Sequence, residues 1–348
     1  MNAAPPPPST FQRVRIHRPG GYHRLRLEPF SPPAPGPGQV RVRTRAIGVN
    51  FADGLVRMGV YAPARRDVGW PITPGFELAG EIDAVGPDLD PTDHLGRPVV
   101  ALTRFDAYAE AVTVDAALTF PLPAGWSMAA GAAVPVQALT ARHALRLAGA
   151  PAGSPVLVHS AAGGVGHWLV QLARADGLAV TGSVGRGEKC RAVRGLGARH
   201  CLVRDGAADR TDATAYQAVF DAQGPASWRR SYRRLAPTGR LVVYGAHGLT
   251  GGGGVRWWRS GWAYLTRPRF DPMRLCADNR GVLGFNLAYL FDRRAEMRAD
   301  LAAVTALVDA GTVRLPPIAT LPLAEVAEAH RRLESGATVG KLVLVTEA

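Results

Sequence analysis

Three small residues are regularly spaced in the stretch VLVHSAAGGVGHWLVQLA, residues 156–173. Ser160, Gly163 and Gly166 occupy the small-residue positions of a G-x-x-G-x-x-G turn. The apolar run before the turn is typical of a strand, and the run after it is typical of a helix. Glycines let the backbone approach a pyrophosphate, and a helix N-terminus offers free N–H groups to it. The pattern therefore predicts a dinucleotide site at Gly163, Gly164, Val165 and Gly166.

The next predicted strand, LAVTGSV at residues 178–184, distinguishes the two nicotinamide dinucleotides. A carboxylate at its end would accept the ribose hydroxyls of NAD and would repel the 2′-phosphate of NADP. Ser183 stands there instead, and Arg186 and Lys189 follow it. Both cations could pair with a phosphate. We therefore predict NADPH over NADH, although Glu188 opposes this preference and both cations could belong to a solvated helix start.

The elements that must position these residues differ along the chain. Residues 11–125 contain short β-rich segments broken by Gly and Pro, which predict an antiparallel, barrel-like region. After about residue 127, strands and helices alternate, which predicts a doubly wound parallel sheet. Residues 249–275 combine a glycine run with three tryptophans and several arginines. We interpret this segment as a lid or dimer contact. The alternative is a surface at residues 255–264 that contacts lipid or a hydrophobic ligand.

Composition narrows the function classes. The net charge is +13, but 39 of the 41 basic residues are arginines spread along the chain, a pattern typical of GC-rich bacterial coding. No nucleic-acid motif accompanies the charge, so no nucleic-acid partner is expected. No signal peptide or run of ~18–20 apolar residues is present. Cys190, Cys201 and Cys276 share no close spacing, so we expect neither a disulfide framework nor a metal cluster, and a cytoplasmic location.

Several motifs carry a resemblance to a known family. NFADGLVRMGVY, TPGFELAGEIDAVG, HSAAGGVGHWLVQLA and VGKLVLV resemble the zeta-crystallin/quinone oxidoreductase branch of the medium-chain dehydrogenase/reductase superfamily. RWWRSGW followed by NRGVLGFNLAYL is closer to its synaptic-vesicle membrane-protein-like subgroup. The resemblance implies a homodimer of α/β chains. After a disordered tail at residues 1–10, each chain has a GroES-like β-rich catalytic domain at residues 11–132 and 306–348 and a Rossmann NADPH-binding domain at residues 133–305.

The same resemblance bears on the reaction. At the positions of the family's catalytic zinc ligands, this sequence has Asn50, Phe76 and the apolar stretch around Val134–Val136. Such side chains do not form a zinc site, so no metal is expected. Without a Lewis acid nothing activates an alcohol. We therefore expect hydride transfer from NADPH to a small electrophilic substrate, a quinone or an α,β-unsaturated carbonyl. The alternative is a cofactor-binding, membrane-associated or scaffold module with little catalysis.

The resemblance also implies roles for single residues. Asn50 would lie near the nicotinamide and donate to the developing enolate oxygen, or it is only a turn residue. Tyr61 would line the substrate cleft, or it packs on the surface. Lys189 would contact the 2′-phosphate, joined by Arg204, which replaces a family tyrosine. Apart from the resemblance, His247 follows Gly245 and could supply the proton because a histidine titrates near pH 7, or it is a loop histidine without a role. The other cofactor positions are Thr140, Gly245, Phe285, Asn286 and Lys341.

Overall fold

The computed structural model describes residues 10–247, 250–251, 254–255 and 265–346. Nearly all of the predicted tail, residues 1–10, lies outside these residues. The chain divides into two compact units. The first contains Met1–Pro135, Ile318–Glu334 and Leu342–Ala348, and the second contains Val136–Pro317 and Ser335–Lys341. The chain returns to the first unit at Ile318 rather than at residue 306, because residue 306 lies within a helix that belongs to the second unit.

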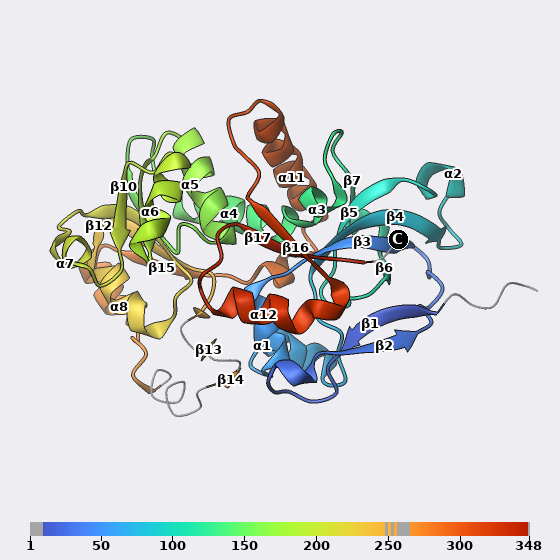
Figure 1. Cartoon of the computed structure of the whole chain (residues 1–348). Coiled ribbons are helices and arrows are strands. Elements are labelled where there is room, and N and C mark those ends of the chain that lie inside the picture. The colour runs from blue at the N-terminus through green and yellow to red at the C-terminus, as the bar shows by residue number, and fades with distance from the viewer. Residues whose placement is uncertain (1–9, 248–249, 252–253, 256–264, 347–348) are drawn as a thin grey trace, which may run out of the picture. The chain divides into compact units, whose positions relative to one another are not determined.

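The first unit is built on an antiparallel sheet with the strand order β16-β17-β3-β4-β5-β7, and β6 also pairs with β3 (Figure 1). Its long strand β3 shows why the sequence forms this sheet. Val40, Val42 and Thr44 are buried, whereas the arginines between them are not, as expected for a strand with one face on the core. The hairpin β1-β2 is separate.

The strands of this unit are β1 (Phe11–Arg15), β2 (Arg26–Phe30), β3 (Gln39–Gly48), β4 (Glu77–Val85), β5 (Pro98–Leu102), β6 (Ala111–Asp115), β7 (Thr119–Pro121), β16 (Ile318–Pro322) and β17 (Lys341–Val345). Its α-helices are α1 (Phe51–Arg57), α2 (Pro91–His94), α3 (Met128–Ala132) and α12 (Val326–Glu334). Helix α3 packs on β3, β4 and β5, and α12 packs on α1.

The second unit contains six parallel strands in the order β10-β9-β8-β11-β12-β15. Numbered along the chain, this is the order 3-2-1-4-5-6 of the dinucleotide-binding fold. The strand β8 at its centre is buried on both faces: Val156, Leu157 and Val158 are each 0% exposed. Such central parallel strands need continuous apolar sequence, which VLV supplies. The predicted doubly wound sheet is confirmed.

The strands of this sheet are β8 (Pro155–His159), β9 (Ala179–Val184), β10 (His200–Val203), β11 (Tyr216–Asp221), β12 (Leu235–Val243) and β15 (Gly281–Gly284). The helices described in this unit are α4 (Pro135–Ala148), α5 (Gly164–Ala175), α6 (Cys190–Gly195), α7 (Ala207–Thr211), α8 (Pro225–Arg233), α10 (Pro272–Asp278) and α11 (Arg294–Asp309). Helices α5 and α6 pack on β9, and α8 packs on β11 and β12.

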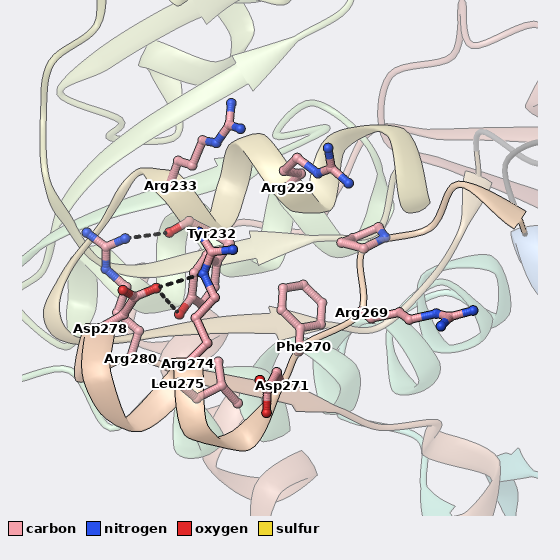
Figure 2. A pocket seen from close by; sticks show the side chains of 11 residues that line it. Arg229, Tyr232, Arg233, Arg269, Phe270, Asp271, Arg274, Leu275, Asp278 and Arg280 are labelled. Carbon is pink, nitrogen blue, oxygen red and sulfur yellow. Dashed lines mark hydrogen bonds and ion pairs between the residues drawn. The ribbon is translucent and has the colours of Figure 1, made fainter.

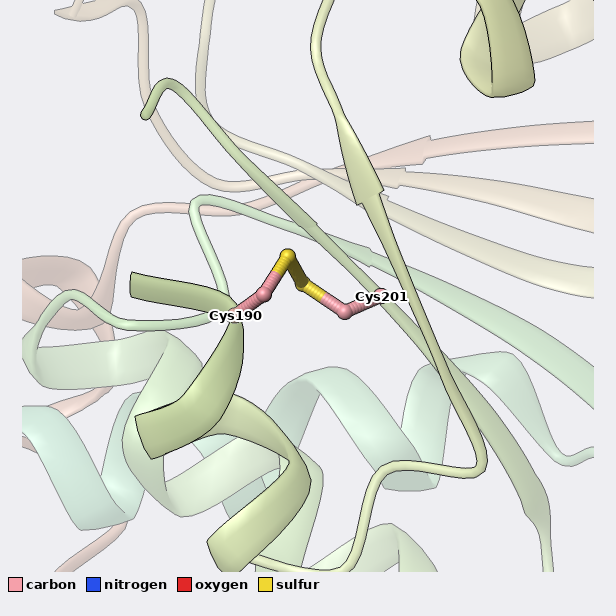
Figure 3. The surroundings of a disulfide bond; sticks show 2 residues. All are labelled: Cys190 and Cys201. Atoms are coloured by element: carbon pink, nitrogen blue, oxygen red, sulfur yellow. A yellow bond between two sulfur atoms is a disulfide. The ribbon is translucent and has the colours of Figure 1, made fainter. Parts of the chain in front are cut away.

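The cysteine prediction was wrong in one respect. Cys190 and Cys201 form a disulfide, with their Cα atoms 5.6 Å apart (Figure 3). Cys190 begins α6, and Cys201 lies in β10, the strand to which α6 leads. The crossover between two neighbouring parallel strands brings the two residues together, and linear spacing does not reveal this. Cys276 is free and exposed.

The Trp-rich segment is described only in part. The short strands β13 (Thr250–Gly251) and β14 (Gly254–Val255) form an antiparallel pair. Of the predicted lipid-facing surface at residues 255–264, all but residue 255 lies outside the described residues. The predicted lid or dimer-contact segment, residues 249–275, is described only at residues 250–251, 254–255 and 265–275. Among the helices of the described residues, none has the length and apolar character to cross a membrane.

Candidate active site

The glycine turn of the second unit has the geometry that a dinucleotide phosphate needs. Ser160 turns the chain at φ 52°, and Gly163 is the N-cap of α5. A Cβ on Gly166 would lie 2.3 Å from the carbonyl oxygen of Ser160 and 2.7 Å from the Cα of Ala161. Only glycine therefore lets α5 start this close to β8. The first N–H groups of a helix lack acceptors within the helix and can bind an anion.

Gln137, in α4, lies directly against this turn. A Cβ on Gly164 would be 2.1 Å from its Nε2 atom. Gln137 is buried, and its Oε1 atom has no hydrogen-bond partner among the described residues. The sequence offered no local signal for this residue, because a glutamine in an apolar helix matches no motif. Thr140, one turn later, donates from Oγ1 to the carbonyl oxygen of Val136 at 2.6 Å and keeps acceptor capacity on the same oxygen.

The end of β9 has no carboxylate side chain, as the sequence predicted. Ser183 is fully buried, and its Oγ atom has no hydrogen-bond partner among the described residues. Arg204 follows β10, the neighbouring strand, and its backbone N–H donates to Val184 at 2.8 Å. Its half-buried guanidinium forms no hydrogen bond or ion pair with the described residues. Burial lowers the pKa of Arg204 from its usual value, and nearby carboxylates, first Asp205, partly offset this.

The other two predicted cations are placed differently. Lys189 donates from Nζ to the carbonyl oxygens of Gly336 and Thr338, both at 2.7 Å. An ammonium has three donors, so one remains for a ligand. Burial, followed by the charge of Arg186, lowers the pKa of Lys189. The Arg186 side chain is 57% exposed and lies 3.9 Å from a carboxylate oxygen of Glu188. Of the three cations, Arg204 is thus the one whose side chain forms no hydrogen bond or ion pair with the described residues, so it is the most available to bind a ligand.

The carboxyl ends of β12 and β15 carry the predicted nicotinamide-side residues. Gly245 follows β12 closely packed, since a Cβ there would lie 3.1 Å from the Cβ of Ala222. The ring of Phe285 meets that of His143 edge-on, with centroids 4.7 Å apart. Asn286 accepts the backbone N–H of Ala288 at 3.1 Å and caps a short 3-10 helix. A contact with the cofactor stays a prediction for all three.

Two residues are less suited to their predicted roles, which are proton donation for His247 and cofactor binding for Lys341. Burial lowers the pKa of His247 to about 4, so its imidazole is neutral at pH 7. It therefore does not hold a proton there as an imidazolium. Lys341 is only 2% exposed at the start of β17. A contact between its ammonium and the cofactor stays a prediction, and the burial of Lys341 does not favour it.

In the first unit, Asn50 is held by buried partners. It caps α1, where its backbone N–H donates to Asp53 at 2.7 Å. Its amide nitrogen donates to Oε1 of Glu77 at 2.8 Å and to the carbonyl oxygen of Gly48 at 3.3 Å. Both amide hydrogens thus point to protein acceptors, so donation to a substrate would require one of them to be released. That role stays a prediction. The sequence reasoning assigned no role to Glu77, which is fully buried.

Tyr61 belongs to an aromatic cluster of the same unit. Its ring meets Phe76 edge-on at 5.6 Å and Phe105 at 6.3 Å between centroids, and it is half-buried. The cluster offers an apolar surface on which a flat molecule could stack. Phe76, at the position of a family zinc ligand, is thus part of a ring cluster. Within the described residues, no group of three or more His, Cys, Asp or Glu side chains could hold a metal ion.

Comparisons with known proteins agree with this geometry. An alcohol dehydrogenase GroES-like domain model matches residues 36–124, and a model described as zinc-binding dehydrogenase matches residues 196–344. The human synaptic vesicle membrane protein VAT-1 homolog is 32% identical over 94% of this chain and 84% of its own length. The chain belongs to the quinone oxidoreductase and VAT-1 branch of the medium-chain dehydrogenase/reductase family. The predicted fold class and the prediction of a medium-chain oxidoreductase are therefore confirmed.

Two bacterial relatives extend the comparison. A quinone oxidoreductase of Pseudomonas aeruginosa is 33% identical over 96% of this chain and 99% of its own. The solved structure of an Escherichia coli quinone oxidoreductase complexed with NADPH has a TM-score of 0.83 and 27% identity. It covers 96% of this chain and 99% of that one. Both belong to the same family branch as this chain.

Proposed function

We propose that this oxidoreductase uses NADPH to reduce a quinone or an α,β-unsaturated carbonyl and that it works without zinc. The observation that carries the proposal is Arg204, a half-buried guanidinium with no hydrogen bond or ion pair among the described residues, next to the acid-free end of β9. A 2′-phosphate would supply the missing partner. The NADPH complex of the E. coli relative supports the same cofactor.

The residues of the chain fit the cofactor at two places. The glycine turn and the first N–H groups of α5 would hold the pyrophosphate. Ser183 and Arg204, with the third hydrogen of Lys189, would hold the 2′-phosphate. The orphaned Oγ of Ser183 would donate to a phosphate oxygen, and the orphaned Oε1 of Gln137 would accept from a ribose hydroxyl of the cofactor. Bound NADPH supplies a hydride from its nicotinamide ring.

The substrate class follows from the side chains that are present. Asn50 and Phe76 stand where the family's zinc enzymes have ligands, so an acceptor that is already electrophilic suits this chain. The ring cluster of Tyr61, Phe76 and Phe105 would orient a flat acceptor by stacking. Because His247 is neutral at pH 7, water is the proton source in this proposal. A relative named quinone oxidoreductase supports the same class.

The direct test compares NADPH and NADH on the purified protein. We expect NADPH to bind at least about tenfold more tightly (~1.4 kcal/mol). Arg204→Ala should remove one charge-assisted contact and weaken NADPH by roughly 1.5–3 kcal/mol, while NADH changes little. Arg199→Ala is the matched control, since Arg199 is an exposed arginine of the same unit. Steady-state rates with quinones, enones and simple alcohols then define the acceptor.

The proposal fails in either of two outcomes. If neither nucleotide binds, the chain is not a reductase. If NADH binds as tightly as NADPH and Arg204→Ala changes neither, the cofactor preference is wrong. Oxidation of simple alcohols at rates that depend on added zinc would refute the zinc-free reduction.

The proposal includes a homodimer, and it keeps the expected cytoplasmic location, where a disulfide such as Cys190–Cys201 would be transient. β15 is the last strand of its sheet, and its outer edge is unpaired among the described residues. An unpaired edge is a template for a second strand, so two β15 strands could join two sheets. Sedimentation equilibrium should then give twice the mass of the chain. A single-chain mass at micromolar concentration would exclude the dimer.

A further inference from the structure

A pocket of about 390 Å³ in the second unit has a strongly positive lining (Figure 2). It lies between α8, α10 and the chain that leads into α10. Five arginines and two aspartates line it, namely Arg229, Arg233, Arg269, Arg274, Arg280, Asp271 and Asp278. Five positive charges against two negative ones leave an excess of three. Like charges around one cavity repel each other, so an anion in the cavity would relieve the repulsion.

Three of these arginines have no counter-ion. Arg229, Arg233 and Arg269 form no hydrogen bond or ion pair with the described residues, and all three are exposed. Arg229 and Arg233 project from one face of α8, four residues apart (Figure 2). By contrast, Arg274 lies 3.7 Å from Asp278, and Arg280 donates to the carbonyl oxygen of Tyr232. The unpaired guanidinium groups could make bidentate contacts with a phosphate.

Two aromatic rings give the pocket an apolar side. Phe270 and Tyr232 have ring centroids 5.5 Å apart, and Phe270 packs against the buried cluster that contains Tyr232. The Arg280 guanidinium lies over the Tyr232 ring at 5.6 Å. A ring surface beside phosphate-binding groups suits a ligand with a flat ring and a phosphate. We propose that this pocket is a second anion site, which binds a phosphorylated nucleoside.

The pocket is separate from the glycine turn. Arg233 ends α8, and Leu235 begins β12 just after it. Helix α10 likewise leads into the start of β15. The pocket therefore lies toward the amino ends of these parallel strands. The glycine turn follows the carboxyl end of β8, and such sheets bind their dinucleotide at that edge.

Calorimetric titration of the full chain tests the proposal, with one equivalent of NADPH, which occupies the tighter turn and leaves no excess to fill the pocket. The probes are adenosine 3′,5′-bisphosphate, inorganic phosphate and adenosine. We expect one saturable site for the bisphosphate, weaker binding of phosphate, and at least tenfold weaker binding of adenosine. Arg229→Gln, Arg233→Gln and Arg269→Gln should each weaken the bisphosphate by about tenfold (~1.4 kcal/mol). The matched control Arg199→Gln should leave it unchanged.

Salt provides a second readout, because binding to exposed guanidinium groups should weaken as ionic strength rises. The proposal is overturned if the bisphosphate shows no saturable binding at millimolar concentration. It is equally overturned if the three pocket variants, shown to be folded by circular dichroism, bind it as tightly as Arg199→Gln does.

The disulfide carries an independent inference. Cys190 directly follows Lys189, and Cys201 precedes Arg204 by three residues. The bond therefore fastens the loop after β9 to the strand that leads to Arg204 (Figure 3). In the same register, Cys201 pairs with Gly182 in the neighbouring strand. Both cysteines are half-buried, so a small thiol can reach them.

We infer that the redox state of Cys190 and Cys201 sets the affinity for the 2′-phosphate, an inference that rests on the proposed NADPH function. A dithiol reductant breaks the S–S bond and forms two protein thiols, and it becomes a disulfide itself. Two electrons and two protons pass to the protein. Reduction removes the covalent link between the start of α6 and β10, so only packing and hydrogen bonds then hold Lys189 and Arg204 at their separation. In a reducing compartment disulfides are rare, and those that occur are usually transient and catalytic or redox-sensing.

Titration of NADPH and NADH before and after dithiothreitol treatment tests this inference. Intact mass spectrometry confirms the gain of two hydrogens. We expect NADPH to bind about fivefold more weakly after reduction and NADH to be unchanged. Cys190→Ser with Cys201→Ser should abolish the difference, whereas Cys276→Ser, which removes the free exposed thiol, should keep it.

The outcomes separate the two proposals. If NADPH binds in neither redox state, the proposed cofactor function has failed. If NADPH binds equally in both states while Arg204→Ala still weakens it, only the redox inference is overturned. An equal change for NADH and NADPH would also overturn it, because that result would indicate general loosening of the unit rather than an effect on the 2′-phosphate site.

Discussion

Replacing Gly166 with alanine should damage both folding and cofactor binding. The new Cβ would lie 2.3 Å from the carbonyl oxygen of Ser160 and 2.7 Å from the Cα of Ala161. Both are backbone atoms of the turn, so no side chain can rotate away. A normal carbon–oxygen contact requires about 1 Å more space, so the start of α5 must move by about that distance. Overpacking of this kind costs about 3 kcal/mol, near the upper end of its usual range.

Chemical denaturation measures the stability part of this prediction. Guanidinium unfolding should give a lower midpoint with an unchanged slope. The same displacement of α5 moves its N–H groups away from the pyrophosphate, so NADPH should bind at least about tenfold more weakly (~1.4 kcal/mol). Gly163→Ala should be milder, because its Cβ would meet only the Ser160 carbonyl oxygen at 3.2 Å. Gly195→Ala should cost nothing, since no atom lies within 4 Å of its Cβ position in α6.

A small effect would refute this reasoning. If Gly166→Ala loses less than about 1 kcal/mol, the turn has enough slack to absorb a methyl group. If it loses stability but binds NADPH normally, the helix start does not hold the pyrophosphate. The ranking of the three alanine variants matters more than any single value, because all three add the same methyl group.

Two further predictions concern buried ionisable side chains. Burial lowers the pKa of His159 to about 4 and that of His330 to about 3, against 6.5 when unfolded. The unfolded chain therefore binds more protons below pH 6.5, and each histidine should cost about 2 kcal/mol of stability between pH 7 and 5, measured by denaturation at both pH values. Arg57, whose side chain is 0% exposed, pairs with Glu334 at 2.8 Å. Glu334→Gln removes this ion pair and should lower the free energy of unfolding by about 3 kcal/mol in the same assay. Glu328→Gln removes the carboxylate that pairs with Arg332 at the surface, so it should lower the free energy of unfolding by less than about 0.5 kcal/mol.

Features that depend on nearby residues were predictable from the sequence. The strand, the turn with Ser160, Gly163 and Gly166, and the helix after it form one continuous segment. Their spacing reflects a local steric requirement, which the contact at Gly166 makes visible. The absence of an acid at the end of β9 is likewise a property of one strand. Apolar VLV runs alternating with helical segments were enough to predict the parallel sheet.

Features that depend on distant pairings were not predictable. Lys189 donates to carbonyl oxygens of residues almost 150 positions away, and no sequence pattern indicates that partner. Gln137 meets the glycine turn only because α4 and α5 pack in the second unit. Glu77 and Asn50 pair across 27 positions. In each case the residue type was visible, but its partner followed from the fold.

The cations near β9 explain why a missing acid matters energetically. Burial lowers the pKa of both Arg204 and Lys189, which means that the folded chain bears a cost for keeping them charged. Neither forms an ion pair with a carboxylate among the described residues. A carboxylate at the position of Ser183 would have removed this cost within the protein. Its absence leaves the cost to be relieved by a ligand, and a dianionic phosphate relieves more of it than a ribose hydroxyl can. The proposed preference for NADPH would therefore be tied to folding free energy as well as to direct contacts.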